Sequence, residues 1–443
     1  MSDKELFQAW FREHAIEDVE AFVPDMAGAA RGKLLPADKF GSGEMKMPEG
    51  IFAQTVSGDY VPNDNNVEDR DMILVPDAKT LRPVPWATDP AASVFLDCRR
   101  KDGSPVNTSP RQVLQNVMQT YAEHGWVPVV APEVEFYLLN PHSDPFAEVE
   151  PPEGRLGRTE TAKQPYSIDT MNDFDPFIND VYLYCEAQGI RIDTLSQEMG
   201  PAQFEINFLH GDPIALADQV FLFKRTIREA AIKHEMHATF LARPMSEEAG
   251  SALHIHQSVI DDNGRNIFSE ADGQPTELFY SYIGGLQRYV PEALLMLAPY
   301  PNSYRRFLSY WASPINLQWA IDNRTVGLRV PDAAPDARRV ENRLAGADVN
   351  PYLAIAATLA CGYLGMIEGL KPTEPITGTA YDKPFDLHRT LHAAIRAFED
   401  SAAMRKVLGD QFVSLYTAVK HGENNEFQQI VTPWEREVLM FNV

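Results

Sequence analysis

Polar and apolar residues alternate along four stretches of the chain, at 131–138, 201–208, 250–258 and 338–344. Successive side chains of a β-strand point to opposite faces, so each stretch predicts a strand with one polar face and one apolar face. We expect these strands to form a sheet whose apolar back packs against helices and whose polar front binds a ligand. The polar fronts carry Glu133 and Glu135; Gln203, Glu205 and Asn207; His254, His256 and Ser258; and Arg339, Glu341 and Arg343.

The pattern elsewhere predicts a small first domain, residues 1–106, and a large second domain, residues 107–443. A Gly-rich stretch from Asp25 to Lys33 predicts a structural hairpin rather than a phosphate-binding loop, because it lacks the P-loop spacing. Ser109 and Pro110 predict the N-cap and first turn of a helix that Gly125 ends. The other predicted elements are helices at 4–15, 213–234 and 351–367, strands at 19–23, 72–76, 93–98 and 239–242, and mainly helical structure after residue 372.

The polar fronts are rich in groups that bind metal ions. Carboxylates that converge in a buried place repel one another and lose hydration, so they require a cation, a proton or an arginine between them. A site rich in oxygen with a nitrogen ligand suits Mg²⁺ or Mn²⁺ better than Zn²⁺. One pair of glutamates is more often an exposed strand edge, but the repetition in four strands favours a metal site. The candidate ligands are Glu133, Glu135, Glu198, Glu205, Glu341, His254 and His256.

Composition excludes some partners. The 443 residues carry a formal net charge of -24 at pH 7, which argues against nucleic acid, because phosphate backbones bind to basic surfaces. Cys98, Cys185 and Cys361 show no paired spacing, which fits a reducing cytoplasm. The first residues lack the apolar core of a signal peptide, and the uncharged run at 351–367 is short for a membrane span. We therefore expect a cytoplasmic protein without a membrane or nucleic-acid partner.

Seven motifs, in one order along nearly the whole chain, resemble the signature of the glutamine synthetase family. The resemblance implies an α+β fold, with a small β-grasp domain at 1–106 and a large α/β catalytic domain at 107–443 built on a curved antiparallel sheet. It also implies a dodecamer of two hexameric rings, with active sites between neighbouring subunits. The motifs are Glu133-x-Glu135, Gly200-Pro-Ala-Gln-Phe-Glu205, Gly250-Ser-x-x-His-x-His256, Asn302-Ser-Tyr-Arg-Arg306, Asp322-Asn-Arg-Thr325, Arg338-Arg-Val-Glu-x-Arg343 and Ala347-Asp-x-Asn-Pro-Tyr352.

The family joins an amine to the γ-carboxylate of glutamate. ATP first phosphorylates the carboxylate, and the amine then displaces phosphate, a transfer between anions that metals and arginines assist by neutralising charge. By resemblance, two or three Mg²⁺ or Mn²⁺ ions would be held by Glu135, Glu198 and Glu205 and by Glu133, His254 and Glu341. Arg306 and Arg324 would act in catalysis, Gly250, Arg306 and Arg343 would bind glutamate, and His256, Ser258, Arg329 and Arg339 would bind ATP.

Two departures from the family pattern concern the amine. The segment 52–59 stands in place of an Asp-Gly-Ser-Ser motif whose aspartate binds ammonium, and Ala312 stands where a flap glutamate would fall. With these departures the chain is most similar to the γ-glutamylpolyamine branch, the glutamate–putrescine ligases. We expect Tyr310 or Trp311 to hold an alkylammonium through a cation–π contact, and a second amine group to be held by Asp59, Asp64 or Glu68.

Four alternatives remain open from the sequence. They are a glutamine synthetase that uses ammonium, a γ-glutamyl-monoamine synthetase, a two-metal phosphate hydrolase, and a non-catalytic relative that acts in assembly or regulation. Some family members are nucleotidylated on a tyrosine, but the different residues that flank Tyr381 argue against that modification here. The motifs name no base that deprotonates the amine.

Overall fold

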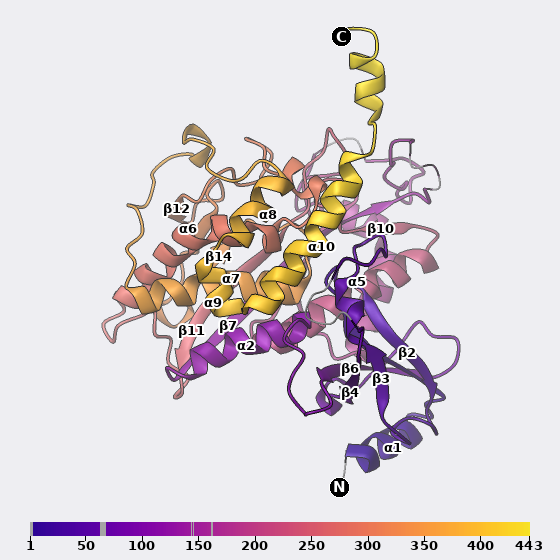
Figure 1. Cartoon of the computed structure of the whole chain (residues 1–443). Helices are drawn as coiled ribbons and strands as arrows, with labels where there is room; N and C mark the ends of the chain where they lie inside the picture. Colours follow the sequence, from indigo (N-terminus) through magenta and orange to yellow (C-terminus); the bar gives the residue numbers. More distant parts are fainter. Residues whose placement is uncertain (1–2, 63–67, 143, 145, 161–162) are drawn as a thin grey trace.

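The computed structural model describes residues 3–62, 68–142, 144, 146–160 and 163–443. The described chain forms two sheets with helices around them (Figure 1). The first sheet has six strands in the order β2-β1-β6-β4-β3, with β5 paired to β6, and it confirms the helix and strands predicted for this region. Its elements are α1 Asp3–Glu13, β1 Asp18–Pro24, β2 Ala30–Pro36, β3 Met45–Pro48, β4 Asp71–Pro76, β5 Arg82–Pro83 and β6 Ala91–Arg99.

The turn between β1 and β2 is organised by Asp25. Its carboxylate accepts hydrogen bonds from the backbone N–H groups of Ala27 (3.0 Å) and Ala29 (2.8 Å). Gly28 has a left-handed φ of 79°, which costs glycine less than any residue with a side chain. Arg31 forms an ion pair with the same aspartate at 2.7 Å. The Gly-rich stretch is therefore a hairpin, as predicted.

The second sheet has eight strands in the order β12-β13-β14-β11-β7-β9-β8, with β10 paired to β7. Four of its neighbouring strands, β14, β11, β7 and β9, are those that the alternation predicts. The pairs are antiparallel except at one edge, where β12 and β13 run parallel. The strands are β7 Trp126–Leu139, β8 Ile192–Gln197, β9 Gln203–Phe208, β10 His237–Thr239, β11 Leu253–Asp261, β12 Trp319–Ile321, β13 Leu328–Val330 and β14 Val340–Asn342.

Three local predictions were wrong in detail. The strand expected at 239–242 lies at 237–239, because the N–H of Leu241 donates to the Thr239 hydroxyl (3.1 Å) and turns the chain out of the sheet. Only residues 340–342 of the stretch 338–344 form a strand, since a 3-10 turn at 335–337 precedes them. Ser109 precedes α2 as predicted, but its side chain makes no capping hydrogen bond.

The apolar backs of the central strands pack against helices. The Phe136 ring of β7 lies 5.9 Å from that of Phe204 in β9 and 6.2 Å from that of Phe223 in α5. Helix α7 is long and apolar enough to span a membrane, yet 89% of its apolar window is buried inside the fold, as predicted for a core helix. The helices are α2 Pro110–Ala122, α3 Ile168–Asp173, α4 Asp175–Ala187, α5 Pro213–Lys233, α6 Glu277–Leu297, α7 Pro351–Glu368, α8 Leu391–Glu399, α9 Ala402–Leu408 and α10 Asp410–Gln428.

A buried arginine connects the first sheet to the helices of the second. The guanidinium of Arg111 in α2 lies 2.7 Å from Asp77, 2.6 Å from Asp97 and 3.0 Å from Asp218. Asp77 follows β4 and Asp97 belongs to β6, whereas Asp218 lies on α5. Tyr352 of α7 also donates a hydrogen bond to Asp218. Three carboxylates from both parts of the chain thus share one cation.

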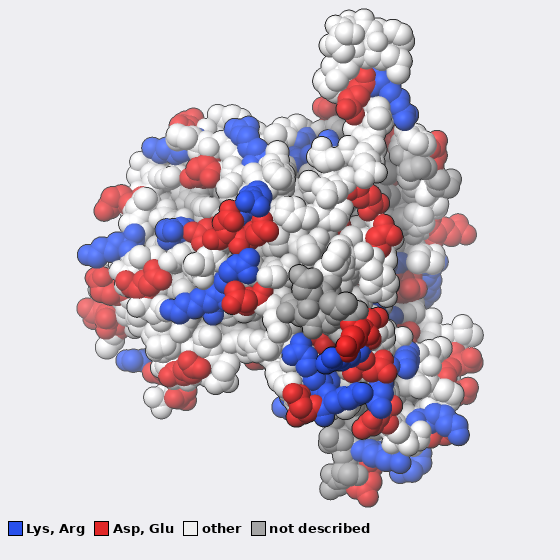
Figure 2. Space-filling view, viewed as in Figure 1, with Lys and Arg blue, Asp and Glu red and all other residues white. Residues whose placement is uncertain are grey.

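The segment after α10 projects from the body of the molecule (Figure 1). Trp434 is 59% exposed and Phe441 is 82% exposed. Figure 2 shows that the tip of this projection carries no charged side chain, whereas acidic and basic residues are interspersed over the visible face of the body. The projection therefore presents apolar surface to solvent in the single chain.

Candidate metal and nucleotide site

The pairing of strands in the second sheet places the polar side chains predicted from the alternating sequence pattern on one face, opposite one another. Strand β7 lies between β9 and β11, and β14 lies on the other side of β11. Glu198 directly follows β8. The opposed residue pairs across these strands are Glu133 and His254, Glu133 and Asn207, Glu135 and Glu205, and His256 and Glu341.

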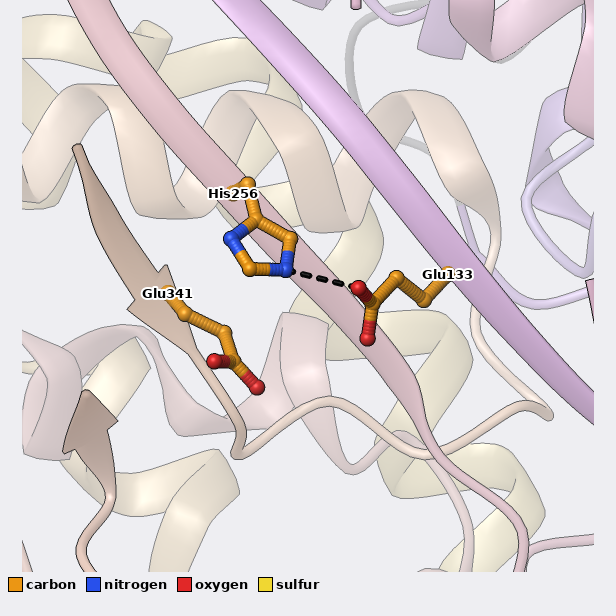
Figure 3. A group of neighbouring side chains, drawn as sticks. All are labelled: Glu133, His256 and Glu341. Carbon is orange, nitrogen blue, oxygen red and sulfur yellow. Dashed lines mark hydrogen bonds and ion pairs between the residues drawn. The ribbon is translucent and has the colours of Figure 1, made fainter. Parts of the chain in front are cut away.

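Two triads of carboxylate and imidazole groups lie close enough to share a cation. One is Glu133, His256 and Glu341, and the other is Glu133, Glu205 and His254. Within each triad the ligand atoms lie within 4.8 Å of one another. In Figure 3 the side chains of the first triad reach from three neighbouring strands toward one space. Glu133 belongs to both triads and therefore lies between the two candidate ion positions.

Two carboxylates of the cluster are held in the ionised form. Burial pushes the pKa of Glu133 upward, but hydrogen bonds with His254 and His256 outweigh burial and lower that pKa well below its usual range. Burial likewise opposes ionisation of Glu341, yet Arg343 and the two histidines lower its pKa to about 2. Both groups are therefore negative at neutral pH and available as ligands.

The protein does not provide the remaining three carboxylates with enough positive charge to offset their burial and mutual repulsion. Burial and the neighbouring charge of Glu198 raise the pKa of Glu135 to about 8. Burial raises the pKa of Glu198 to about 7, despite the opposing effect of Arg324. Burial and four nearby carboxylates raise the pKa of Glu205 well above its ordinary value. Such a set needs a multivalent cation to ionise fully, and oxygen donors with one imidazole fit Mg²⁺ or Mn²⁺.

The two histidines differ in their hydrogen bonding. Burial and the charge of Arg343 lower the pKa of His254 to about 4, so its imidazole is neutral and can ligate a metal. His256 accepts a hydrogen bond at Nδ1 from Arg339 (3.2 Å), which leaves Nε2 to donate to Glu133 at 2.8 Å. A nitrogen that carries a proton is not a ligand. Arg339 thus fixes the proton of His256 on the nitrogen that faces Glu133, whereas His254, whose Nδ1 lies 3.4 Å from Glu133, can present that nitrogen to a metal without a proton.

Arginines with unsatisfied N–H groups surround the cluster. Among the described residues, the enclosed Nε groups of Arg306, Arg329 and Arg343 have no hydrogen-bond acceptor, and buried donors of this kind fit an anionic ligand. Arg343 also pairs with Glu341. Gly250 is required beside Arg306, because a Cβ there would lie only 2.6 Å from the Cγ of that arginine.

A cavity of about 540 Å³ opens beside the first triad. Its walls include His256, Ser258 and Arg339, three of the four residues assigned to ATP. The volume lies within the range of roughly 300–1,000 Å³ that is usual for small-ligand pockets. The fourth residue, Arg329, instead donates hydrogen bonds to Glu341 (2.8 Å) and Asp322 (2.6 Å).

The aromatic residues assigned to the amine already contact other side chains. Tyr310 is 72% exposed, and its ring lies 4.9 Å from that of Tyr381. The Trp311 ring lies 5.0 Å from the Lys163 ammonium and 5.0 Å from the Arg243 guanidinium. Neither cation stood out in the sequence, because both lie in loops without a periodic pattern. Trp311 itself was the sequence feature that indicated a cation bound at this position.

The acidic residues assigned to the second amine lie in another part of the chain. Asp59 is exposed and closes a turn, in which its N–H donates to the Thr55 hydroxyl at 3.1 Å. No hydrogen bond or ion pair between described residues connects Asp59 to the metal cluster. Glu68 pairs with Arg70 at the surface, and Asp64 lies outside the described residues. Their proposed role stays a prediction.

Comparison with known proteins identifies relatives over the whole chain. Gamma-glutamylputrescine synthetase PuuA of Escherichia coli (strain K12) is 35% identical, over 96% of this chain and 92% of that protein. Glutamate–isopropylamine ligase of Pseudomonas sp is 33% identical, over 96% of this chain and 95% of its own length. The ligand-free structure of GmaS superposes with a TM-score of 0.84 at 26% identity and covers 98% of this chain and 99% of its own.

The fold similarity confirms the predicted α+β fold class, and ATP and divalent metals are used throughout the family of these proteins. Residues 107–439 match the catalytic domain of glutamine synthetase. This range is most of the chain and includes the metal cluster, the arginines and the cavity. The chain belongs to the glutamine synthetase family.

Proposed function

We propose that this protein is an ATP-dependent ligase that joins the γ-carboxylate of glutamate to a primary amine, with a diamine such as putrescine as the acceptor. The observation that carries the proposal is the meeting, on one sheet face, of a carboxylate–histidine cluster with enclosed guanidinium N–H groups that lack acceptors. Metal ligands beside unsatisfied cations suit phosphoryl transfer between two anions. A phosphate hydrolase would need no second set of anion-binding arginines.

The chain's own residues bind and orient the reactants in this proposal. Divalent ions, when bound to the cluster, would neutralise phosphate charge and polarise the transferring group. Arg306 and Arg343 hold the substrate glutamate, and the exposed Arg324 lies close enough to Glu198 to oppose the rise of its pKa. Arg324 can therefore stabilise charge that develops on the phosphoryl oxygens at the edge of the cluster. Arg339 faces the nucleotide cavity.

The proposed acceptor is an alkyl amine rather than ammonium. The names of two relatives specify putrescine and isopropylamine. In this chain, Ala312 stands where the flap glutamate of glutamine synthetases would fall, and the segment 52–59 lacks their Asp-Gly-Ser-Ser motif, although it ends in Asp59. Ala312 is uncharged and smaller than a glutamate, which favours an acceptor with a carbon chain. Glutamine synthetase and monoamine ligase activities are the alternatives that the assay below separates.

The proposal also covers the oligomeric state of the protein and its location in the cell. We place the protein in a dodecamer of two hexameric rings, in which the first sheet of one subunit would complete the site of the next. The exposed apolar side chains of the C-terminal projection support an assembly that covers them. The three cysteines are free and buried, which supports a cytoplasmic location. A non-catalytic role is disfavoured, because every predicted metal ligand is present.

The experiment that tests the function is phosphate release with ATP, Mg²⁺ and glutamate, comparing ammonium, methylamine, ethanolamine, putrescine and spermidine at equal concentration. The expected result is strong turnover with the di- and polyamines. Fastest turnover with ammonium would show a glutamine synthetase, and fastest turnover with methylamine would show a monoamine ligase. Phosphate release without any amine would favour the hydrolase, and silence with every amine would overturn the ligase proposal.

A further inference from the structure

Three segments far apart in the sequence meet at the indole ring of Trp311. The Lys163 ammonium comes from the loop before α3, and Glu247 and Glu248 come from the loop before β11. Trp311 belongs to the segment 309–314 before β12, which we call the flap. The ammonium lies 3.2 Å from Glu248 Oε2, donates to the Glu247 carbonyl at 3.1 Å, and lies 5.0 Å from the indole centroid. A carboxylate, a carbonyl and an aromatic ring thus surround one primary ammonium group.

Each of these three kinds of contact would also bind the ammonium group of another primary alkylamine. A –NH₃⁺ group has three donors and no acceptor, a carboxylate gives it a charge-assisted hydrogen bond, and an indole ring attracts the cation and its neighbouring methylene groups. Among the described residues, the enclosed Oε2 of Glu248 has no hydrogen bond, although it lies within ion-pair distance of Lys163. Lys163 therefore neutralises the Glu248 carboxylate without donating a hydrogen bond to it, and the carboxylate can still accept one from another cation.

This ammonium position lies at one end of the polar row that carries the metal ligands. Tyr137 follows Glu135 by two residues on the same face of β7, a separation of about 7 Å along a strand. The Tyr137 hydroxyl donates to the carbonyl of Ala249 at 2.7 Å, directly after Glu248. One tyrosine therefore connects the strand that carries Glu135 to the loop that carries Glu248.

The flap connects the same position to the proposed glutamate site. Arg306, one of the arginines assigned to glutamate, donates to the hydroxyl of Ser313 at 3.4 Å, two residues after Trp311. The segment that carries Trp311 therefore also contacts an arginine assigned to glutamate.

We propose that Glu248, the Glu247 carbonyl and Trp311 form the binding site for the distal ammonium of a diamine acceptor, and that Lys163 occupies it until the diamine displaces it. The inference rests on the proposed ligase function and specifies its acceptor. The Lys163 side chain is 46% exposed, so it can leave the site and remain solvated. An ion pair of a half-exposed lysine is weak, which makes the exchange inexpensive.

The exchange explains how a diamine would be preferred to a monoamine. The distal ammonium of putrescine replaces Lys163 and keeps Glu248 paired. Butylamine has the same carbon chain but ends in a methyl group, which can neither displace Lys163 nor satisfy the carboxylate. The site therefore discriminates by charge at the far end of the amine rather than by its length alone.

The test measures the preference for putrescine over butylamine in wild type, Glu248→Gln and Lys163→Ala. Two readouts are used: the ratio of kcat/KM values from phosphate release, and the ratio of dissociation constants from calorimetry with glutamate, Mg²⁺ and ADP present. The matched control is Glu148→Gln, which removes one exposed carboxylate outside the ammonium site. Glu248→Gln should reduce the putrescine preference about tenfold or more, as expected for loss of a charged hydrogen bond. Lys163→Ala should raise the preference, because it removes the competing ammonium.

The outcomes separate this inference from the ligase proposal. If Glu248→Gln changes the preference by less than about threefold, or no more than Glu148→Gln does, the ammonium site is overturned even when amines are turned over. If phosphate release is absent with every amine but calorimetry shows putrescine binding that depends on Glu248, the ammonium site stands and the ligase proposal fails. If Glu248→Gln does not fold, Lys163→Ala decides: a lowered or unchanged preference overturns the inference.

Discussion

Mg²⁺ binding to the cluster should weaken steeply as the pH falls from about 8 to about 6. The pKa of Glu135 is raised to about 8 and that of Glu198 to about 7, so both carboxyl groups carry protons at the lower pH and the ion has to displace them. Glu135 and Glu198 together contribute roughly one displaced proton between these two pKa values and roughly two below them, and Glu205, whose pKa is also raised, adds to that number. The affinity should therefore fall at least about tenfold from pH 8 to 7 and at least about a hundredfold from pH 7 to 6.

The same groups act on the stability of the metal-free protein in the opposite direction. A carboxyl group whose folded-state pKa lies above its unfolded value binds more protons when folded. Its contribution to the free energy of unfolding is therefore complete below the pKa of the unfolded state and is lost as the pH rises through the pKa of the folded state. For Glu135 that loss extends from the ordinary value of 4.5 to about 8. Mg²⁺ should consequently raise the melting temperature more at pH 8 than at pH 6.

Calorimetry in buffers of different ionisation enthalpy measures both the affinity and the protons released. The matched variant Glu135→Gln should bind Mg²⁺ more weakly at pH 8 and release about one proton fewer at pH 6.5 than the wild type does. An affinity that is independent of pH would refute the reasoning. So would an unchanged proton count in Glu135→Gln, because the proton would then come from another group.

Three further predictions concern packing and substrate binding. Arg111→Met should lower the free energy of unfolding by about 3–5 kcal/mol in urea titrations, because it leaves the buried Asp218 carboxylate without its cation. Adding Asp218→Asn should recover part of that loss, and strict additivity would contradict the shared-cation explanation. Gly250→Ala should abolish glutamate-dependent phosphate release, because the new Cβ would collide with Arg306, while the dissociation constant of ADP stays unchanged in calorimetry. An active Gly250→Ala enzyme would show that the arginine is not held there. Arg339→Gln should raise the KM for ATP about tenfold and leave that for glutamate unaltered, and an equal rise in both would place Arg339 outside the nucleotide site.

The polar front of the sheet was predictable because strand geometry is local. Alternation over β7, β9 and β11 fixes which side chains share a face, and the observed register brings Glu133, His254 and Glu205 together. Strand β14 has only three residues, too few for a pattern to define its ends. The predicted polar residues on either side of it, Arg339 and Arg343, lie outside the strand although they still contact His256 and Glu341.

The contacts at the flap were not predictable in the same way. Lys163, Glu248 and Trp311 lie in irregular segments whose positions depend on long-range packing, and no spacing rule relates them. The strand predicted at 239–242 was wrong for a related reason, since a single hydrogen bond from the Leu241 N–H to the Thr239 hydroxyl ended it early. The parallel pairing of β12 and β13 depends on the path of the chain between them and not on their composition.

The tight packing around Gly250 has a consequence for how this enzyme can change. The proposed glutamate end of the site allows almost no substitution, because Gly250 lies against a carbonyl and a buried arginine. The proposed acceptor end includes exposed side chains such as Tyr310 and Lys163, where replacements disturb little packing. Laboratory evolution should therefore yield variants with new acceptor amines in few steps, whereas variants that accept a donor other than glutamate should require rebuilding of the backbone around Gly250.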